Sequence, residues 1–284
     1  MNSFMLPPAL ARLSAVCDRF VVPCVSFSLE PVQGVIPVGT SNLGGAADLP
    51  AGFAWPANKS RPLDYLLQVD LAEASRHDSS GLLPRSGLLS FFYDLQEQPW
   101  GYDPKDLEGF CVVHTPPNTS LQHRTGPHPD YALQEFRLSF SAGLTLPVLG
   151  SRDYERLETS AALTDNERHA YSVFASQLSK GPNQPQGGSR HRLLGHADNI
   201  QGDMQLEAQL VTNGLYCGNP SGYSDPRARS LEPGADEWVL LLQLDSDDGS
   251  GLMWGDCGRL YYWIRRPDLA VLRFDRVWMT LQCF

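Results

Sequence analysis

The chain has 284 residues, 42% hydrophobic and 19% charged, a composition typical of a globular protein long enough to bury a core. Its formal net charge is −10 and it has no run of basic residues, so we expect no nucleic-acid binding. No apolar stretch approaches the roughly 20 residues that span a bilayer, so we expect no membrane insertion either.

The first 20 residues have prolines at positions 7 and 8 and no basic start before an apolar core. We therefore expect no secretory signal and a cytoplasmic protein. Apolar side chains recur at helical spacing over residues 9–20, which predicts a short amphipathic helix. The six cysteines include no Cys-x-x-Cys pair, so we expect buried, reduced thiols rather than disulfides or a zinc site.

Residues 21–38 are rich in β-branched and apolar types and predict one or two strands. Further strands are predicted over four segments: residues 63–69, 87–94, 109–115 and 132–146. Asp70 is placed to cap a helical turn that follows the first of these. The stretch 115–131 holds four prolines and is interpreted as a surface connection.

The clearest helical region is predicted over 151–180, where Thr164 and Glu167 have the spacing of a reciprocal capping box. The Gly/Pro/Gln-rich segment 181–189 ends it and marks the boundary between two halves. We predict an N-terminal half, 1–180, and a C-terminal half, 190–284, packed as one compact unit. The second half contains a predicted helix, 204–213, ended by Gly214, and predicted strands over 238–244 and 260–264. A mixed run of apolar and polar residues, 273–283, closes the chain.

Three landmarks recur in the same order in the two halves. Leu66-Leu67-Gln68-Val69-Asp70 returns as Leu241-Leu242-Gln243-Leu244-Asp245. Each copy follows a glycine and alanine stretch that ends in aspartate, at Asp48 and Asp198, and precedes a glycine that opens an aromatic run. The sequence therefore predicts an α+β fold of mostly antiparallel sheets with a few helices, built by internal duplication of two similar halves.

The repeated Gln-x-Asp pairs, Gln68/Asp70 and Gln243/Asp245, place an amide and a carboxylate on one face of a strand. In one interpretation the two pairs line a cleft between the halves and bind a polar ligand. In the other, each glutamine bonds a neighbouring strand end while the aspartate caps the next segment. The second interpretation needs no ligand.

Five loop aromatics lie beside Gly, Pro or Asp: Trp55, Trp100, Tyr102, Tyr223 and Trp254. They are either staples that hold loops onto the core or parts of a recognition surface. The acidic segment 245–256, which ends at Asp256, superficially resembles a calcium loop. Its glycines fall at the fifth and seventh positions rather than the sixth, so we interpret it as an acidic hairpin turn.

The seven histidines match no zinc motif, and the chain has no nucleophile elbow, phosphate loop or dinucleotide fingerprint. We therefore expect no metal and no cofactor, and we assign no catalytic residue. The candidate ligand-binding residues are Asp48, Trp55, Gln68, Asp70, Asp198, Gln201, Gln243, Asp245, Trp254 and Asp256.

Several separate motifs together resemble one known family. They are Gly44-Gly45-x-x-Asp48-Leu49-Pro50, Phe53-x-Trp55-Pro56, the two Gln-x-Asp repeats, Leu194-Gly195-His196-x-Asp198-x-Ile200-Gln201, and Trp254-Gly255-Asp256. Over nearly its whole length the chain resembles the YwqG-like bacterial family. The resemblance implies a domain of unknown function with a duplicated α+β fold and brings no established catalytic residues. Similar proteins occur near toxin and immunity genes, which makes an immunity-like, protein-binding role one hypothesis.

Two functional hypotheses follow. The first is a non-catalytic module that binds an unknown protein or a small polar ligand. The second is an enzyme or small-molecule receptor with an acidic cleft between the repeats, in which Asp70, Asp245 or Asp256 acts as acid or base.

Overall fold

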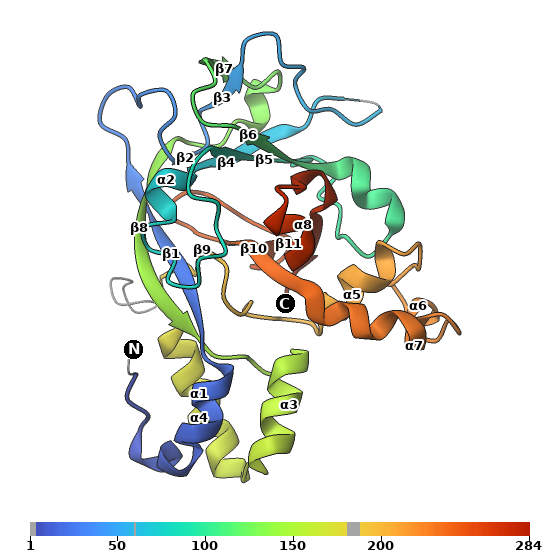
Figure 1. Ribbon diagram of the computed structural model, residues 1–284. Coiled ribbons are helices and arrows are strands. Elements are labelled where there is room, and N and C mark those ends of the chain that lie inside the picture. The colour runs from blue at the N-terminus through green and yellow to red at the C-terminus, as the bar shows by residue number, and fades with distance from the viewer. Residues whose placement is uncertain (1–3, 60, 181–187) are drawn as a thin grey trace.

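The computed structural model describes residues 4–59, 61–180 and 188–284. Within these ranges it combines helices with antiparallel strands, which confirms the α+β prediction. The main sheet has ten strands and curls into a nearly closed barrel (Figure 1). In hydrogen-bonding order they are β12 (Trp278–Gln282), β11 (Arg259–Arg265), β10 (Trp238–Asp245), β9 (Arg192–Leu193), β1 (Val22–Pro31), β8 (Phe136–Thr145), β2 (Asn42–Leu43), β4 (Asp64–Asp70), β5 (Leu88–Tyr93) and β6 (Phe110–Thr115).

The middle of this sheet is the long β1–β8 pair, which stays in register from Val22 opposite Thr145 to Pro31 opposite Phe136. The two edge strands, β6 and β12, approach each other around the barrel. The Phe110 and Trp278 rings lie edge to face with centroids 5.4 Å apart. The space enclosed by the sheet is therefore filled with large apolar side chains, which form the main core of the molecule.

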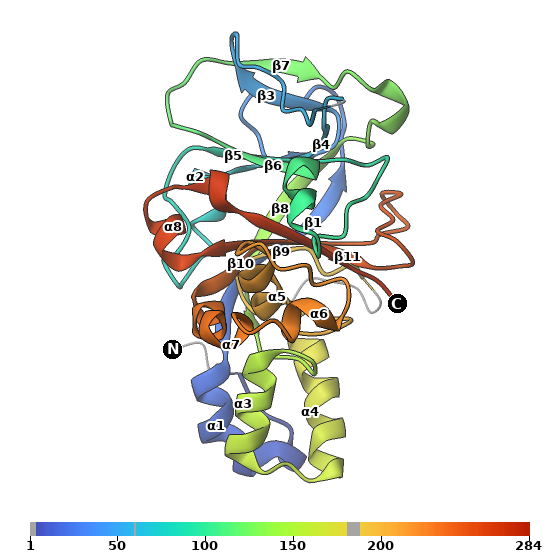
Figure 2. The same ribbon diagram turned by 90° about the vertical axis from the view of Figure 1, so that its right-hand side faces the viewer.

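A second, two-stranded sheet joins β3 (Ala46–Pro50) to β7 (Leu121–Thr125) and lies at one end of the barrel (Figures 1 and 2). β7 falls inside the stretch 115–131, so the interpretation of that whole stretch as a connection is wrong. Its sequence has too few apolar residues to predict a strand, and only its pairing with β3 establishes one. Over 21–38 the chain forms the single strand β1.

The helices form two groups. One, at the end of the molecule opposite β3 and β7, is a layer that packs around its own core, which includes Leu13, Tyr154 and Tyr171 (Figure 2). It consists of η1 (Pro8–Leu13), α1 (Ser14–Phe20), α3 (Arg152–Ala161) and α4 (Asp165–Leu178). The predicted capping box is confirmed, because Thr164 Oγ1 accepts from Glu167 N and Glu167 Oε2 accepts from Thr164 N.

The other group lies along the C-terminal strands (Figure 2). It contains α5 (Met204–Val211), α6 (Pro220–Tyr223), α7 (Ala228–Leu231), η4 (Glu232–Glu237), α8 (Arg266–Ala270) and η5 (Phe274–Arg276). The remaining short helices are α2 (Leu71–Ala74), η2 (Pro104–Gly109) and η3 (Pro129–Tyr131). None of the helices in the described ranges has the length and apolarity to cross a membrane. α5 matches the predicted helix, and Gly214 follows it at φ +85°.

The predicted boundary segment 181–189 lies for the most part outside the described residues, which omit 181–187. Strands from both sides of it nevertheless belong to one sheet, since β9 pairs with β1. Cys17, Cys24, Cys217 and Cys283 are buried, as expected. Cys257 is exposed, contrary to that expectation, because it lies in the turn before β11 with a positive φ of 51°.

Candidate functional site

Gln68, on β4, is a buried amide that bonds Asp48, the middle residue of β3. Its Oε1 accepts from the Asp48 backbone N–H at 2.9 Å. Its Nε2 donates to the Thr40 carbonyl at 2.9 Å and to Asp48 Oδ2 at 2.6 Å. Asp48 is itself buried, and its other carboxylate oxygen lies 2.6 Å from His123 Nδ1 on β7.

Gln243, on β10, makes the same three contacts in the second half. Its Oε1 accepts from the Asp198 backbone N–H at 2.9 Å. Its Nε2 donates to the Arg190 carbonyl at 2.7 Å and to Asp198 Oδ2 at 2.9 Å. The two glutamines therefore have the same structural role, because each forms hydrogen bonds with a buried backbone N–H, a carbonyl and a carboxylate.

The strands that carry these glutamines also pair alike. β4 runs against β5 with Gln68 opposite Ser90, and β10 runs against β11 with Gln243 opposite Tyr261. Both ladders have an irregularity two residues before the glutamine, between Tyr65 and Leu67 and between Leu240 and Leu242. On the other side, Asn42 of β2 pairs with Gln68, and Arg192 of β9 pairs with Gln243.

The surroundings of Gln68 and Gln243 differ in charge. Thr40 and Arg190 supply equivalent carbonyls, while Asn42 and Arg192 occupy equivalent ladder positions. Leu88 is paired with Asp70, whereas Arg259 is paired with Asp245. Three positions that are uncharged around Gln68 are thus arginines around Gln243.

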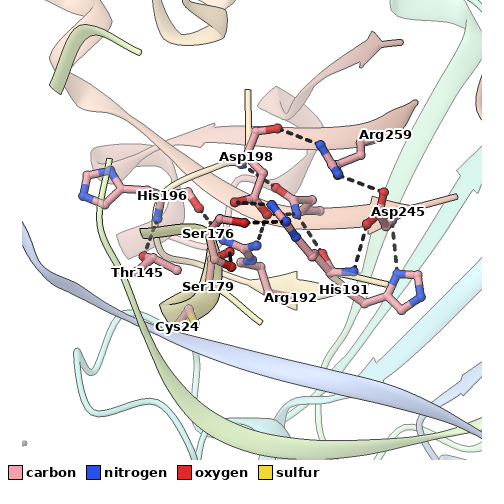
Figure 3. A network of polar contacts seen from close by, with 12 residues as sticks. Cys24, Thr145, Ser176, Ser179, His191, Arg192, His196, Asp198, Asp245 and Arg259 are labelled. Carbon is pink, nitrogen blue, oxygen red and sulfur yellow. Dashed lines mark hydrogen bonds and ion pairs between the residues drawn. The ribbon is translucent and has the colours of Figure 1, made fainter. Parts of the chain in front are cut away.

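These arginines form a buried cluster with two aspartates (Figure 3). Arg192 and Asp198 are 1% and 2% exposed and form a direct ion pair. Arg190 Nη1 lies 3.6 Å from Asp198 Oδ1. Arg259 Nε lies 2.8 Å from Asp245 Oδ1, and its Nη1 donates to the Asp198 carbonyl at 3.2 Å.

The net charge of this cluster stays positive near neutral pH, because the carboxyl and imidazole groups around it do not reverse it. Burial raises the pKa of the Asp198 carboxyl, but the three arginines outweigh it and hold that pKa below its usual value. Burial lowers the pKa of His191 to about 4, so its imidazole is neutral. Asp245 has a raised pKa, chiefly through burial, which Arg259 opposes. Three guanidinium groups therefore face two carboxylates, a surplus of one positive charge.

A cleft of about 520 Å³ lies over this cluster, between α4 and the segment after β9. We call it the arginine cleft. Its polar lining consists of Arg168, His169, Ser172, Ser176, Arg190, Asp198, Asn199 and Arg259. Arg190 and Arg259 reach it with side chains that are 20% and 13% exposed. Arg168 is already paired with carboxylates of α3 and α4, whereas Arg190 also donates to Ser176 Oγ at 2.8 Å.

The other candidate residues are dispersed. Asp70 caps α2, where its Oδ1 accepts from Ala72 N, and Asp256 is exposed in the turn before β11. Trp55 is half-buried, with its ring edge-on to a core phenylalanine, and Trp254 is 1% exposed in the core. Of the ten candidates, Asp198 lines the arginine cleft, and Gln201 lines a separate small pocket described below.

None of the three arginines is among the candidate residues predicted from the sequence. The signal that points to Arg192 is its position directly before the apolar pair Leu193-Leu194. Arg259 has a similar signal, since it opens an apolar strand and stands opposite Asp245 in the ladder. Within the described ranges, no group of three or more His, Cys, Asp or Glu residues is arranged to hold a metal ion.

Comparison with known proteins places the chain in a family without assigning a function. Residues 41–283 match the family model described as a domain of unknown function (DUF1963). The match contains both glutamine–aspartate pairs and the arginine cluster, but it begins after β1, a central strand of the sheet. A search of the curated proteins finds no significant match. Because the family match covers most of the chain, this protein belongs to the DUF1963 family.

Proposed function

We propose that this protein is a non-catalytic binding module whose ligand is a small organic anion held in the arginine cleft. The observation that carries the proposal is the surplus positive charge of the cluster. Arg190, Arg192 and Arg259 share two carboxylates, and two of the three guanidinium groups reach the cleft. A partly desolvated cation without a full counter-charge is costly, and an anion in the cleft removes that cost.

The Gln68 setting provides an internal control for this argument. Around Gln68 the same three amide contacts form with Thr40, Asn42 and Leu88 at the equivalent positions. The hydrogen-bond pattern therefore does not require arginines. Arg192 is the close counter-ion of buried Asp198, so the fold accounts for it. Arg190 and Arg259 have no arginine equivalents around Gln68, and their presence in a chain of net charge −10 supports a ligand role for them.

The cleft also has an apolar side, which favours an organic anion over a simple inorganic one. Val148, Leu149 and Ile200 line it, and Leu149 is 73% exposed. Tyr154, Tyr171 and Ala175 from the helical layer, and Phe284, also line this side. Apolar walls with a few convergent polar groups are typical of small-molecule sites.

The matching contacts of the two glutamines further support our proposal that the halves arose by internal duplication. Under this proposal the arginines were gained, or lost, by one copy only. The finer YwqG-like assignment and a bacterial origin are proposed from the motifs quoted above, and a cytoplasmic location remains a prediction from the sequence.

The acidic-cleft hypothesis has less support. Asp198 and Asp245 are neutralised by arginines, Asp48 is paired with His123, and Asp70 and Asp256 stand apart from the arginine cleft. A protein partner, including an immunity-like one, remains a prediction that affinity capture would test. Trp55 and Trp254 pack against the core rather than forming one exposed surface.

Calorimetric titration with phenyl phosphate tests the proposed function. We expect saturable binding to the wild type, with inorganic phosphate weaker and neutral phenol weaker still. Arg190→Met removes one guanidinium while keeping the backbone N–H that bonds Asp245, and we expect it to weaken binding about tenfold or more.

Arg156→Met is the matched control for this experiment. Arg156, on α3, is also paired with aspartates, Asp153 of α3 and Asp236 of η4, but it does not line the arginine cleft, so its variant should bind like the wild type. Absence of saturable binding at millimolar phenyl phosphate would contradict the proposal. Equal affinity of Arg190→Met and the wild type would do the same.

A further inference from the structure

A second, smaller pocket is lined by residues 201–203, which directly follow residues 198–200 of the arginine cleft, and its charge is the opposite. It has a volume of about 100 Å³. Its lining includes Trp100, Tyr102, Tyr223, Asp203, Glu207 and Gln282. We call it the aromatic pocket, and among the described residues no cationic side chain lines it.

Three of the five loop aromatics noted in the sequence line this pocket: Trp100 and Tyr102 from one loop, and Tyr223 from a distant part of the chain. Trp100 and Tyr102 have ring centroids 6.4 Å apart with planes tilted by 36°. Tyr223 comes from α6, and its hydroxyl donates to Glu207 Oε2 at 3.2 Å. None of these rings is fully buried, so each keeps part of its surface accessible.

The two carboxylates of the aromatic pocket are not equivalent. Both carboxylate oxygens of Asp203 have partners, because Oδ1 caps α5 and Oδ2 lies 3.4 Å from Arg152 Nη1. Among the described residues, Glu207 receives one hydrogen bond, from the Tyr223 hydroxyl, and pairs with no cation. Glu207 is therefore a half-buried carboxyl without a counter-ion, beside aromatic rings.

The backbone around the pocket is held in place before any ligand arrives. Gln282 Oε1 accepts from the N–H groups of Ile200 and Gln201 at 2.9 and 3.0 Å. The carbonyls of Trp100 and Tyr102 accept from backbone N–H groups of other segments, at 2.9 and 2.8 Å. Such preorganisation lowers the entropic cost of binding.

We infer that the aromatic pocket binds a small organic ammonium ion, a primary or methylated amine, between its aromatic rings and Glu207. Aromatic faces attract cations through their quadrupole, and the attraction is strongest where water is excluded. The carboxylate of Glu207 would neutralise the positive charge of such a ligand. A neutral ligand would gain nothing from this carboxylate, so the pocket favours a cation. The volume of about 100 Å³ admits a head group of a few non-hydrogen atoms rather than a large metabolite. This inference is independent of the anion proposed for the arginine cleft.

The pocket should also give the binding a recognisable pH dependence. Burial raises the pKa of Glu207 to about 7, so this carboxyl is half-protonated near neutral pH. The groups that face it are Tyr223, Cys217 and Asp203, with Arg152 behind Asp203. Burial raises the pKa values of Tyr223 and of Cys217 (to about 12), so neither ionises near pH 7. A cation prefers the ionised form of Glu207, so affinity should rise about tenfold from about pH 6 to about pH 8.

Titration of the full chain with tetramethylammonium chloride and with methylammonium chloride, each against sodium chloride at equal ionic strength, tests the inference. We expect saturable binding of at least one ion, which identifies the preferred head group. Glu207→Gln should weaken it at least tenfold and abolish its pH dependence. Tyr223→Leu changes an exposed ring without disturbing the core, and it should also weaken binding. Glu30→Gln, an exposed carboxylate of β1, is the control and should change nothing.

Two results would overturn the inference: no saturable binding of either ammonium ion beyond that of sodium, or unchanged affinity in both Glu207→Gln and Tyr223→Leu. Circular dichroism of each variant verifies that the fold is retained. Arg190→Met should bind ammonium normally, and Glu207→Gln should bind phenyl phosphate normally. The two proposals therefore fail or succeed separately.

Discussion

Replacing Arg192 with methionine is expected to lower the free energy of unfolding by about 3 kcal/mol, because Asp198 then loses its closest counter-ion in the interior. Methionine fills much of the space of the arginine stem, so the lost charge rather than a cavity dominates the effect. Arg190 and Arg259 remain near Asp198, which keeps the loss at the lower end of the range for broken buried pairs. Urea unfolding at neutral pH measures it.

A double variant separates charge from packing in this experiment. Asp198→Asn keeps an oxygen that can accept from Gln243 but removes the stranded charge. Combined with Arg192→Met it should restore more than half of the lost stability. Arg156→Met breaks exposed ion pairs and should cost less than about 1 kcal/mol. An Arg192→Met variant as stable as Arg156→Met would contradict the assignment of Asp198 as a charge that needs its partner.

The same pair predicts the direction of a pH effect. The folded-state pKa of Asp198 is depressed, so its ion pairs stabilise the native state above the unfolded-state pKa and are lost as pH falls through the folded one. Without Arg192, the carboxyl takes up a proton more readily on acidification. The stability gap between the wild type and Arg192→Met should therefore narrow as pH falls from about 7 to about 4.

Local signals in the sequence predicted much of the fold. The capping box at Thr164, the Asp70 cap and the helix that Gly214 follows each depend on residues within one or two turns. The strongly apolar strands, such as β5 and β10, were predicted because burial on both faces leaves a continuous apolar run.

Features that depend on distant partners were not predicted. β9 has two residues and β7 has few apolar ones, so each is a strand only because of its neighbours. Arg192 is buried because Asp198 and the carbonyl of His196 receive its guanidinium. Composition alone places arginine at the surface, and only the assembled sheet shows the exception.

The candidate site likewise combines a feature that the local sequence predicts with contacts that only the fold creates. The repeated Gln-x-Asp motif identifies Gln68 and Gln243 as equivalent residues. Each of them bonds an aspartate distant in sequence, Asp48 or Asp198, and not the aspartate of its own motif. The spacing between Gln243 and Asp198 is more than twice that between Gln68 and Asp48, so the landmarks recur in the same order but without a fixed spacing that would predict the contact. Only the fold brings them together.

Replacing Gln68 or Gln243 with leucine is expected to destabilise the protein by about 2–4 kcal/mol at either position. Each change leaves a buried backbone N–H, a carbonyl and a carboxylate without their amide partner. Unsatisfied buried groups cost about 1–3 kcal/mol each, partly offset by the apolar area that leucine buries. Because the two settings share all three contacts, the two costs should agree within about 1 kcal/mol. Gln122→Leu, an exposed glutamine on β7, controls for the loss of an amide and should be nearly neutral. Urea midpoints of the three variants measure the effects, and a large loss at only one of the two buried positions would contradict their structural equivalence.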